Sequence, residues 1–378
     1  MGPAGALSGM TTRRQAMLLA GLGGAALGGC ALAWPGDPAL AAAVEAEVRP
    51  RVQARQFSGA IVLMQDGRPR VARGWGLANH ALGLPFTTET PCDAASLAKN
   101  FTASGVWLLV HEGRLTLAQP VQALVPEYPH GGVTVRHLLE HSNGLAPDYG
   151  DFDRHFAPGQ VRTTAALLAL AGRDAPAPRF APGSRFAYSD LAYDALALVI
   201  ERVSGEPYAG FVRRRFFGPH GLAQAFARPA RLHDWPVPRT RGYRFDGTRW
   251  QDDDAHDGEA FVGGANLILS AMDVARWGDA WAQGRVLPPD AERAGRERPQ
   301  LGGARSAVDL LGWYGGDEGA ARGHNTGLYN GFRAFVHWER ARRAVVAMVS
   351  NGGLPPHEGE ALQAALVGLL AGAARAAA

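Results

Sequence analysis

A serine and a lysine three residues apart are the side chains of this chain that could most readily do chemistry together. Lys99 is the only lysine among the 38 basic residues, and Ser96 precedes it in the run Ser96-Leu97-Ala98-Lys99. Residues three apart on a helix share one face, so the two side chains can touch. Arginine keeps its proton at any attainable pH, whereas a buried lysine can release it. The pair therefore indicates a serine nucleophile with a lysine partner beside it.

The sequence around the pair predicts the element that positions it. Asp93 can cap a helix that starts near Ala94 and ends at Gly113. Ser96 then lies in the first turn of this helix, where free backbone N–H groups and the helix dipole favour developing negative charge. A helix start is therefore expected to hold the nucleophile.

Strand patterns lie near both ends of the chain, and helical patterns lie between them. Residues 58–64 and 69–76 are typical of a hairpin around Asp66-Gly67, and residues 332–338 and 344–349 are typical of two later strands. Helical apolar spacing covers residues 133–141, 163–171, 190–203, 208–217, 270–283 and 358–374. We therefore expect an α/β (α+β) fold in which one antiparallel sheet is built from both chain ends. Helices flank this sheet, and a mainly helical subdomain is inserted.

The expected domain organisation follows from these patterns. Residues 42–378 are predicted to form one catalytic domain, with the sheet from about 55–90 and 262–378 and the helical subdomain over about 92–245. Residues 1–41 are typical of an export signal, because Arg13-Arg14 precedes an apolar run over 16–33, as in a twin-arginine (Tat) signal.

Two cleavage patterns are present, and the sequence leaves both open. The run that ends at Cys30 resembles a lipoprotein box, which would leave Cys30 lipidated and attached to a membrane. Ala39-Leu40-Ala41 resembles an ordinary signal-peptidase site. With either site we expect an exported protein of the periplasm or cell envelope.

Composition and charge narrow the classes of partner. The net charge is only +3, and Arg213-Arg214-Arg215 is the longest basic tract, which argues against nucleic acid. Cys92 would be the only other cysteine, so no internal disulfide is expected. His137 and His141 stand four apart, as metal ligands on a helix can, but no third ligand is evident. We expect a monomer without metal or cofactor.

Several further motifs follow one another along the chain. They are residues 95–102 around Ser96, residues 134–145, Phe180-Ala181-Pro182-Gly183, Tyr188-Ser189-Asp190, Val203-Ser204-Gly205, Gly263-Gly264 and Val349-Ser350-Asn351. Together they resemble the β-lactamase-related serine hydrolases, which include class C β-lactamases, D-alanyl-D-alanine carboxypeptidases, D-aminopeptidases, and esterases or acyltransferases of the same penicillin-binding-protein fold. The resemblance covers the chain from about Phe57 to Leu370.

The resemblance implies a role for each of these residues. Ser96 would be the nucleophile, Lys99 its activating partner, and Tyr188 the second catalytic member, which moves protons between Ser96 and the leaving group. Two backbone N–H groups would hold the oxyanion, that of Ser96 and one from the strand at Gly327-Leu328. The reaction implied is hydrolysis of an amide or ester, in a small molecule or peptide, through a Ser96 acyl-enzyme.

Asp190 is the first departure from the family pattern. The family usually has Tyr-x-Asn, and an asparagine amide donates hydrogen bonds to a substrate carbonyl, whereas an ionised aspartate only accepts them. A carboxylate beside Lys99 would also favour the charged form of the lysine. We therefore expect the role of the base to shift to Tyr188.

The third motif is the second departure. The family has Lys-Thr-Gly or His-x-Gly, and this chain has His324-Asn325-Thr326-Gly327. By its spacing to Gly331, Asn325 takes the cationic position, although a local bulge could restore His324 to the site. Both departures remove features that suit a carboxylate-bearing substrate. We therefore expect a neutral ester or amide rather than a penicillin or a D-Ala terminus.

Functions of another class stay open at this point. A non-catalytic relative, acting as an envelope receptor for cell-wall peptide or as a scaffold, would tolerate Asp190 and Asn325. A transacylase would pass the acyl group to an alcohol or amine instead of water. The intact set of Ser96, Lys99 and Tyr188 favours an enzyme.

Overall fold

The structure is a computed structural model that describes residues 36–145, 155–157, 159–174, 177–315, 321–352 and 354–376. Arg13-Arg14, the apolar run over 16–33 and Cys30 lie outside the described residues. None of the helices in the described part of the chain is long and apolar enough to cross a membrane.

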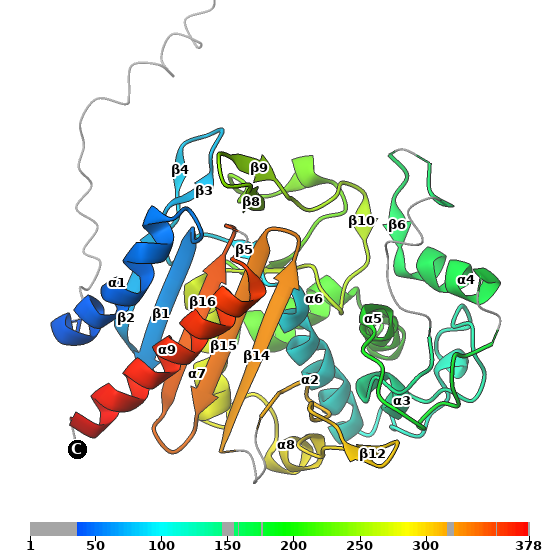
Figure 1. Cartoon of the computed structure of the whole chain (residues 1–378). Coiled ribbons are helices and arrows are strands. Elements are labelled where there is room, and N and C mark those ends of the chain that lie inside the picture. The colour runs from blue at the N-terminus through cyan, green and yellow to red at the C-terminus, as the bar shows by residue number, and fades with distance from the viewer. Residues whose placement is uncertain are drawn as a thin grey trace, which may run out of the picture. The chain divides into compact units, whose positions relative to one another are not determined.

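Five antiparallel strands from the two ends of the chain form the central sheet (Figure 1). Their order is β14 (Arg322–Tyr329), β15 (Phe332–Glu339), β16 (Ala344–Ser350), β1 (Gly59–Gln65) and β2 (Arg68–Trp75). The pairing of β1 with β16 joins the two ends, with Gly59 opposite Ser350 and Gln65 opposite Ala344. The expected fold class, an antiparallel sheet from both chain ends flanked by helices, is confirmed.

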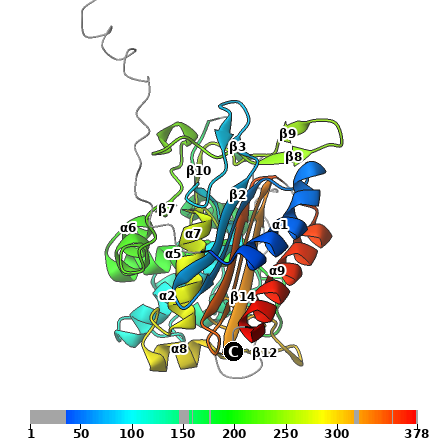
Figure 2. The ribbon, with the colours of Figure 1, turned by 90° about the vertical axis from the view of Figure 1, so that its left-hand side faces the viewer.

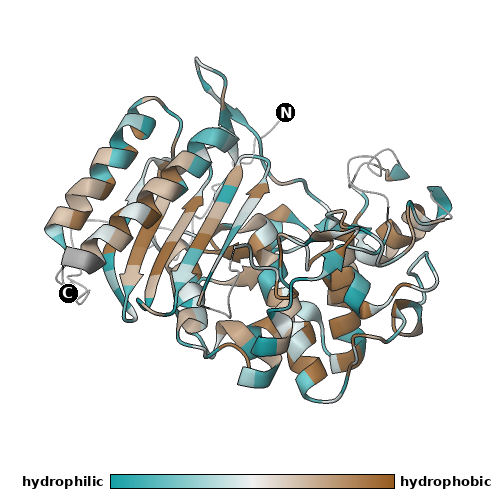
Figure 3. Cartoon of the chain, turned by 60° about the horizontal axis from the view of Figure 1, so that its bottom comes forward, coloured by the Kyte–Doolittle hydropathy of each residue, from teal (hydrophilic) through white to brown (hydrophobic). Residues whose placement is uncertain are grey.

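Helices cover both faces of this sheet because its strands are apolar on both sides (Figures 2 and 3). Along β1, Ala60 and Val62 pack into the core on the side of α7 (Ala271–Ala282), whereas Ile61 and Leu63 pack toward α1 (Pro38–Gln53) and α9 (Pro356–Ala376). Successive side chains of a strand point to opposite faces, so one strand serves two cores.

Helix α1 is not among the elements expected from the sequence. Leu40, Val44 and Val48 recur every four residues and are buried in the core beneath α1 and α9. Residues 39–41, which the sequence offers as a cleavage site, lie in the first turn of this helix. The predicted domain boundary at residue 42 therefore falls inside α1.

The middle of the chain is mainly helical. Its helices are α2 (Ala98–His111), α3 (Val135–Leu139), α4 (Thr164–Asp174), α5 (Asp190–Ser204) and α6 (Tyr208–Val212), which continues as a π-helical turn over Arg213–Phe217; α8 (Pro289–Gly295) follows α7. Short 3₁₀ turns are η1 (Ala95–Leu97), η2 (Val121–Ala123) and η6 (Leu232–Asp234). Helix α2 is the central one, since its residues from Ala98 to Leu109 are all buried.

Short strands complete the described part of the chain. They are β3 (Leu77–Asn79), β4 (Leu84–Pro85), β5 (Cys92–Asp93), β6 (Arg162–Thr163), β7 (Phe226–Ala227), β8 (Tyr243–Phe245), β9 (Trp250–Asp252), β10 (Glu259–Ala260), β11 (Leu267–Leu269), β12 (Gln300–Leu301) and β13 (Ala304–Arg305). Strands β5, β11 and β7 form a three-stranded sheet. Its strand β5 ends at Asp93, shortly before Ser96 in the sequence. This small sheet supports the turn that carries the serine.

Candidate active site

Ser96 lies in the 3₁₀ turn η1 rather than in an α-helix. Helix α2 begins only at Ala98, later than the start near Ala94 expected from the sequence. Asp93 still holds the turn, because its Oδ1 accepts the Ala95 N–H at 2.8 Å. Ala95 has φ +47°, a left-handed conformation that residues with a Cβ rarely adopt. Such backbone strain is concentrated at functional sites, where it fixes the direction of a neighbouring side chain.

Lys99 lies beneath Ser96 and is only 3% exposed. Its Nζ is 3.2 Å from Ser96 Oγ and 2.5 Å from the Gly264 carbonyl oxygen, and it forms an ion pair with Asp190. These three acceptors match the three N–H donors of an ammonium group. Burial lowers the pKa of Lys99, but the charges of Asp190 and Tyr188 outweigh it and hold that pKa above its ordinary value. The lysine is therefore placed as a cation.

Tyr188 is the second side chain in contact with Ser96. Its hydroxyl is 2.8 Å from Ser96 Oγ, and its ring lies over Lys99 with 4.8 Å between Nζ and the ring centroid. Ser189 caps α5 by accepting the Ala192 N–H, which fixes the loop that carries the tyrosine. Residues from η1, α2 and the start of α5 thus meet at one oxygen atom.

His141 supports Tyr188, and sequence reasoning did not assign it this place. Its imidazole lies between the rings of Tyr188 and Tyr193, with ring centroids 4.6 Å and 4.8 Å away. Its Nδ1 accepts the Ser189 N–H at 3.1 Å. Burial, together with the charge of Lys99, lowers the pKa of His141 to about 3, so the ring is neutral. The signal in the sequence was the family motif over 134–145, to which no role was attached.

His137 and His141 do not converge on a shared ligand. His137 lies in the capping box of α3, where its Nδ1 accepts the Thr134 N–H. Among the residues that the structure describes, no group of three His, Cys, Asp or Glu side chains could hold a metal ion.

The third motif lies on β14, and its register is regular. His324 pairs with His337, and Gly327 pairs with Ala334, without a shift along the strand, so the bulge considered for His324 is absent. The His324 N–H bonds to the Tyr314 carbonyl on the other edge of the strand, and the two rings are stacked. Asn325 instead faces the site.

Asn325 is buried and neutral at the position where the family pattern implies a cation. Its Nδ2 donates to Asn100 Oδ1 at 3.0 Å and to the Gly312 carbonyl at 2.8 Å. Asn325 and Thr326 both line the pocket beside Ser96, and the Thr326 hydroxyl donates to the Ala334 carbonyl. The motif therefore contributes the uncharged amide of Asn325 to this pocket, whereas the Thr326 hydroxyl also accepts from Gln363 of α9 and lies on the other face of the sheet.

Strand β14 brings a second backbone donor next to Ser96. The His324 N–H points away from β15, and N–H directions repeat every second residue, so the Leu328 N–H also points to the free edge. An added Cβ at Gly327 would collide with the Ala94 carbonyl and lie 3.0 Å from Ser96 N. Only glycine permits this approach. The N–H groups of Ser96 and Leu328 can thus form an oxyanion hole.

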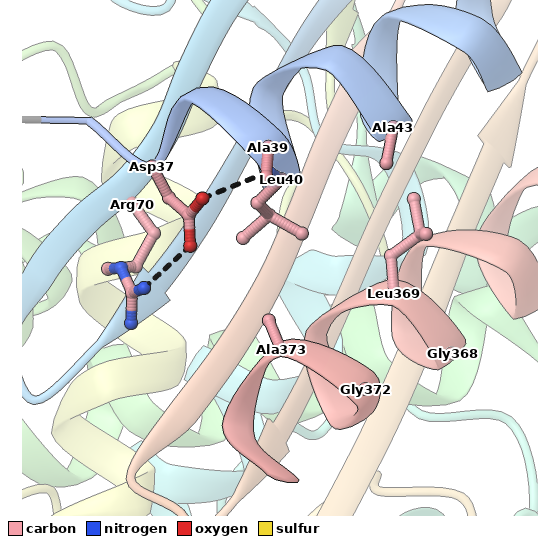
Figure 4. A pocket seen from close by; sticks show the side chains of 9 residues that line it. All are labelled: Asp37, Ala39, Leu40, Ala43, Arg70, Gly368, Leu369, Gly372 and Ala373. Carbon is pink, nitrogen blue, oxygen red and sulfur yellow. Dashed lines mark hydrogen bonds and ion pairs between the residues drawn. The ribbon is translucent and has the colours of Figure 1, made fainter. Parts of the chain in front are cut away.

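The pocket at this site is small, and two aromatic side chains in or next to it are partly exposed. It measures about 20 Å³, and Ser96, Lys99 and Tyr188 are among its lining residues. Tyr188 lines the pocket and Phe186 packs against His141, and each of these two side chains remains 38% exposed. Leu328 is 53% exposed and pairs with Arg333, so its side chain lies on the α9 face of the sheet. A wider groove of about 460 Å³ lies between α1 and α9 (Figure 4), where the charged side chains, Asp37 and Arg70, bind each other. That groove offers no nucleophile.

Comparison with known proteins identifies a family for this chain. The family model described as Beta-lactamase matches residues 44–369. Esterase EstB of Burkholderia gladioli is 31% identical over 300 residues, which cover 70% of this chain and 75% of the esterase. Penicillin-binding protein 4* of Bacillus subtilis is 32% identical over 178 residues, which cover 47% of this chain but only 39% of that longer protein.

Solved structures show the same fold. The crystal structure of a penicillin-binding protein from Bacillus halodurans superposes with a TM-score of 0.73 at 21% identity. The match covers 86% of this chain and 98% of that one.

Proposed function

Because the chain belongs to the beta-lactamase family, we propose that it is a serine hydrolase that cleaves an ester or amide through an acyl-enzyme on Ser96. One observation carries the proposal: Ser96 Oγ lies 2.8 Å from the Tyr188 hydroxyl and 3.2 Å from Lys99 Nζ. A serine hydroxyl needs an adjacent base to become a nucleophile, and Tyr188 is within reach of its proton.

In the proposed mechanism Tyr188 is the base and Lys99 is a fixed cation. Tyr188 acts as a phenolate that the Lys99 cation stabilises. Ser96 Oγ bonds to the substrate carbonyl carbon while its proton passes to this phenolate oxygen, which becomes a neutral hydroxyl. The carbonyl oxygen becomes an oxyanion between the N–H groups of Ser96 and Leu328. Tyr188 then protonates the leaving oxygen or nitrogen, and the bond to it breaks. In deacylation a water oxygen bonds to the acyl carbon while its proton passes to Tyr188. The bond to Ser96 Oγ then breaks, Tyr188 returns the proton to Ser96, and the acid is released.

We propose a neutral substrate, because Lys99 is the only lysine or arginine among the described residues that line the pocket at Ser96. Asn325 is uncharged, and Lys99 is engaged by Asp190. Arg333 does not replace the missing cation. Its guanidinium lies directly against Gly359 of α9, on the other face of the sheet, where even an added Cβ at Gly359 would collide with it. The exposed ring of Phe186, which packs against His141 of the pocket, suits an apolar acyl or alcohol group.

A substrate panel tests this proposal. We expect p-nitrophenyl esters to be turned over faster than nitrocefin and faster than a D-Ala-D-Ala peptide. Ser96→Ala should abolish turnover, whereas Ser104→Ala, which removes a buried hydroxyl from the neighbouring helix α2, should retain it. Faster turnover of nitrocefin or of the peptide would refute the neutral substrate class, and full activity of Ser96→Ala would refute the mechanism.

We also propose export to the periplasm or cell envelope and a monomeric state. The N-terminal pattern at Arg13-Arg14 supports export, and Cys30 supports attachment through a lipid. Cell fractionation with Cys30→Ala tests the anchor, since a lipid-anchored parent should leave the membrane fraction in this variant. Light scattering of purified protein that begins at Gly36 tests the monomer.

A receptor or scaffold is the second candidate. The ion pair between Asp190 and Lys99 favours it, because a lysine held as a cation cannot itself remove the proton of Ser96. This candidate predicts slow or absent deacylation after Ser96 reacts. A transacylase, by contrast, would turn over faster when an alcohol or amine is added as acceptor.

A further inference from the structure

A buried ionic network lies directly behind the nucleophile turn. Arg228 follows β7, and its side chain is fully buried. It forms an ion pair with Glu259 of β10, and its Nη1 is 3.7 Å from Asp93 Oδ2. The Tyr329 hydroxyl donates to the Glu259 carboxylate, with 2.8 Å to each oxygen. Four residues from four separate parts of the chain therefore meet in the interior.

Stability alone does not account for this network. Moving ions out of water costs several kcal/mol each, and well-packed apolar residues in place of a buried ion pair are often as stable or more so. The network also leaves donors and acceptors unused: among the described residues, Arg228 Nε and Nη1 and Asp93 Oδ2 find no hydrogen-bond partner. A costly and incompletely bonded cluster calls for another reason.

The two ends of the network coincide with the two halves of the oxyanion hole. At one end Asp93 accepts the Ala95 N–H and so fixes the strained residue before Ser96. At the other end Tyr329 directly follows Leu328 on β14. These two segments are more than 200 residues apart in the sequence and approach each other at Gly327 and Ser96.

We propose that Arg228, Glu259 and Tyr329 are positioning residues for the acylation step, which hold the Leu328 N–H in register with the Ser96 N–H. The inference rests on the proposed acyl-enzyme function. Tyr329 anchors β14 to Glu259, and Arg228 joins Glu259 to Asp93 and hence to the nucleophile turn. An oxyanion hole made of two segments works only while their spacing is kept, since each donor must reach the same oxygen.

Tyr329→Phe is the sharpest test, because it removes one hydroxyl and keeps the ring. Tyr243→Phe is its control: Tyr243 is buried, Tyr329 is partly buried, and the Tyr243 hydroxyl accepts the His80 N–H without contacting Asp93, Glu259 or Ser96. The readouts are the rate constant of the p-nitrophenol burst, KM and Tm. A phenylboronic acid adds a fourth, because its serine adduct is tetrahedral and mimics the oxyanion.

We expect Tyr329→Phe to slow the burst about tenfold, which is less than the roughly 100-fold or greater loss when an oxyanion donor is removed outright. The affinity for the boronic acid should weaken by a similar factor, while KM and Tm stay close to those of Tyr243→Phe. Arg228→Lys, which keeps the charge, should retain more of the burst rate than Arg228→Met.

The outcomes separate this inference from the proposed function. If the parent protein gives no burst with any ester, the proposed function fails and the positioning role fails with it. If the parent gives a burst and Tyr329→Phe gives an equal one, only the positioning role is refuted. A lower Tm in Tyr329→Phe with an unchanged burst and boronic acid affinity also refutes it, because that result describes a purely structural network.

Discussion

Asp190→Asn changes the charge beside Lys99 and little else. The carboxylate of Asp190 forms an ion pair with Lys99 Nζ, and the amide of asparagine has nearly the same shape without the charge. Burial lowers the pKa of Lys99, and the charges of Asp190 and Tyr188 raise it further than burial lowers it. In the variant the effect of burial stays and the main opposing charge is gone, so the pKa of Lys99 falls.

The size of the change follows from the geometry. Two unit charges about 4 Å apart at an effective dielectric constant of about 20 attract by about 4 kcal/mol, which is about a thousandfold in a protonation equilibrium. This is an upper value, because the Asp190 side chain is 27% exposed and water screens part of the attraction. The pH at which Lys99 loses its proton should therefore fall by up to about three pH units.

The pH dependence of kcat/KM shows what this change does to catalysis. A group whose pKa is raised keeps its proton until the pH passes that raised pKa, so the parent should keep Lys99 charged beyond the ordinary titration range of lysine. If the cation stabilises Tyr188, Asp190→Asn should lose activity on the alkaline side at a lower pH than the parent. Activity near pH 7 should change by less than about threefold, because Lys99 is still charged there.

Two results would refute this reasoning. Profiles that coincide would show that Asp190 does not control the charge of Lys99. Higher activity of Asp190→Asn at neutral pH, with the acid limb moved to lower pH, would show that the neutral lysine is the base. Asp234→Asn on the exposed turn η6 is the matched control for losing one negative charge, and its profile should equal that of the parent.

Three further predictions follow from contacts in the structure. Tyr188→Phe should lower kcat by about 10²–10⁴ with little change in KM, because it removes the proposed base, and a loss below about threefold in steady-state assays would contradict this role. Gly327→Ala should lower kcat by about 100-fold and the free energy of unfolding by about 1–3 kcal/mol, because the added Cβ collides with the Ala94 carbonyl. Kinetics and urea unfolding equal to those of the parent would argue against this close approach. Phe101→Ala should lower the free energy of unfolding by about 3–5 kcal/mol, because Phe101 stacks on Trp277 with 4.0 Å between ring centroids, and a loss below about 1 kcal/mol on urea titration would contradict that packing.

The regular elements could be predicted from the sequence because their signals are local. Residues 58–64 and 69–76 fall on β1 and β2, and the expected helix over 270–283 contains α7, whose N-cap is Ser270. Helix α1 was missed although Leu40, Val44 and Val48 carry a helical pattern, because its first turn was assigned to a signal cleavage site. The helix was therefore missed because residues 39–41 were interpreted as a signal-peptidase site, although the helical pattern itself is clear.

The details of the site depend on contacts between distant segments, which no local pattern encodes. The start of α2 was predicted near Ala94, but the contact of Asp93 with Ala95 N–H and the approach of Gly327 replace the first helical turn by η1. The positions of His324 and Asn325 could be chosen only once the pairing of β14 with β15 and with Tyr314 was visible. The motif predicted which residues gather, and the strand register decided which of them face the pocket.

Mass spectrometry of a covalent adduct tests the central claim most directly. A fluorophosphonate bonds to an activated serine oxygen and releases fluoride, so the peptide that carries the adduct identifies the nucleophile. The account predicts one adduct at Ser96, which is absent in Ser96→Ala and forms more slowly in Lys99→Ala and Tyr188→Phe. No adduct in folded parent protein, or an adduct on another serine that persists in Ser96→Ala, would contradict it.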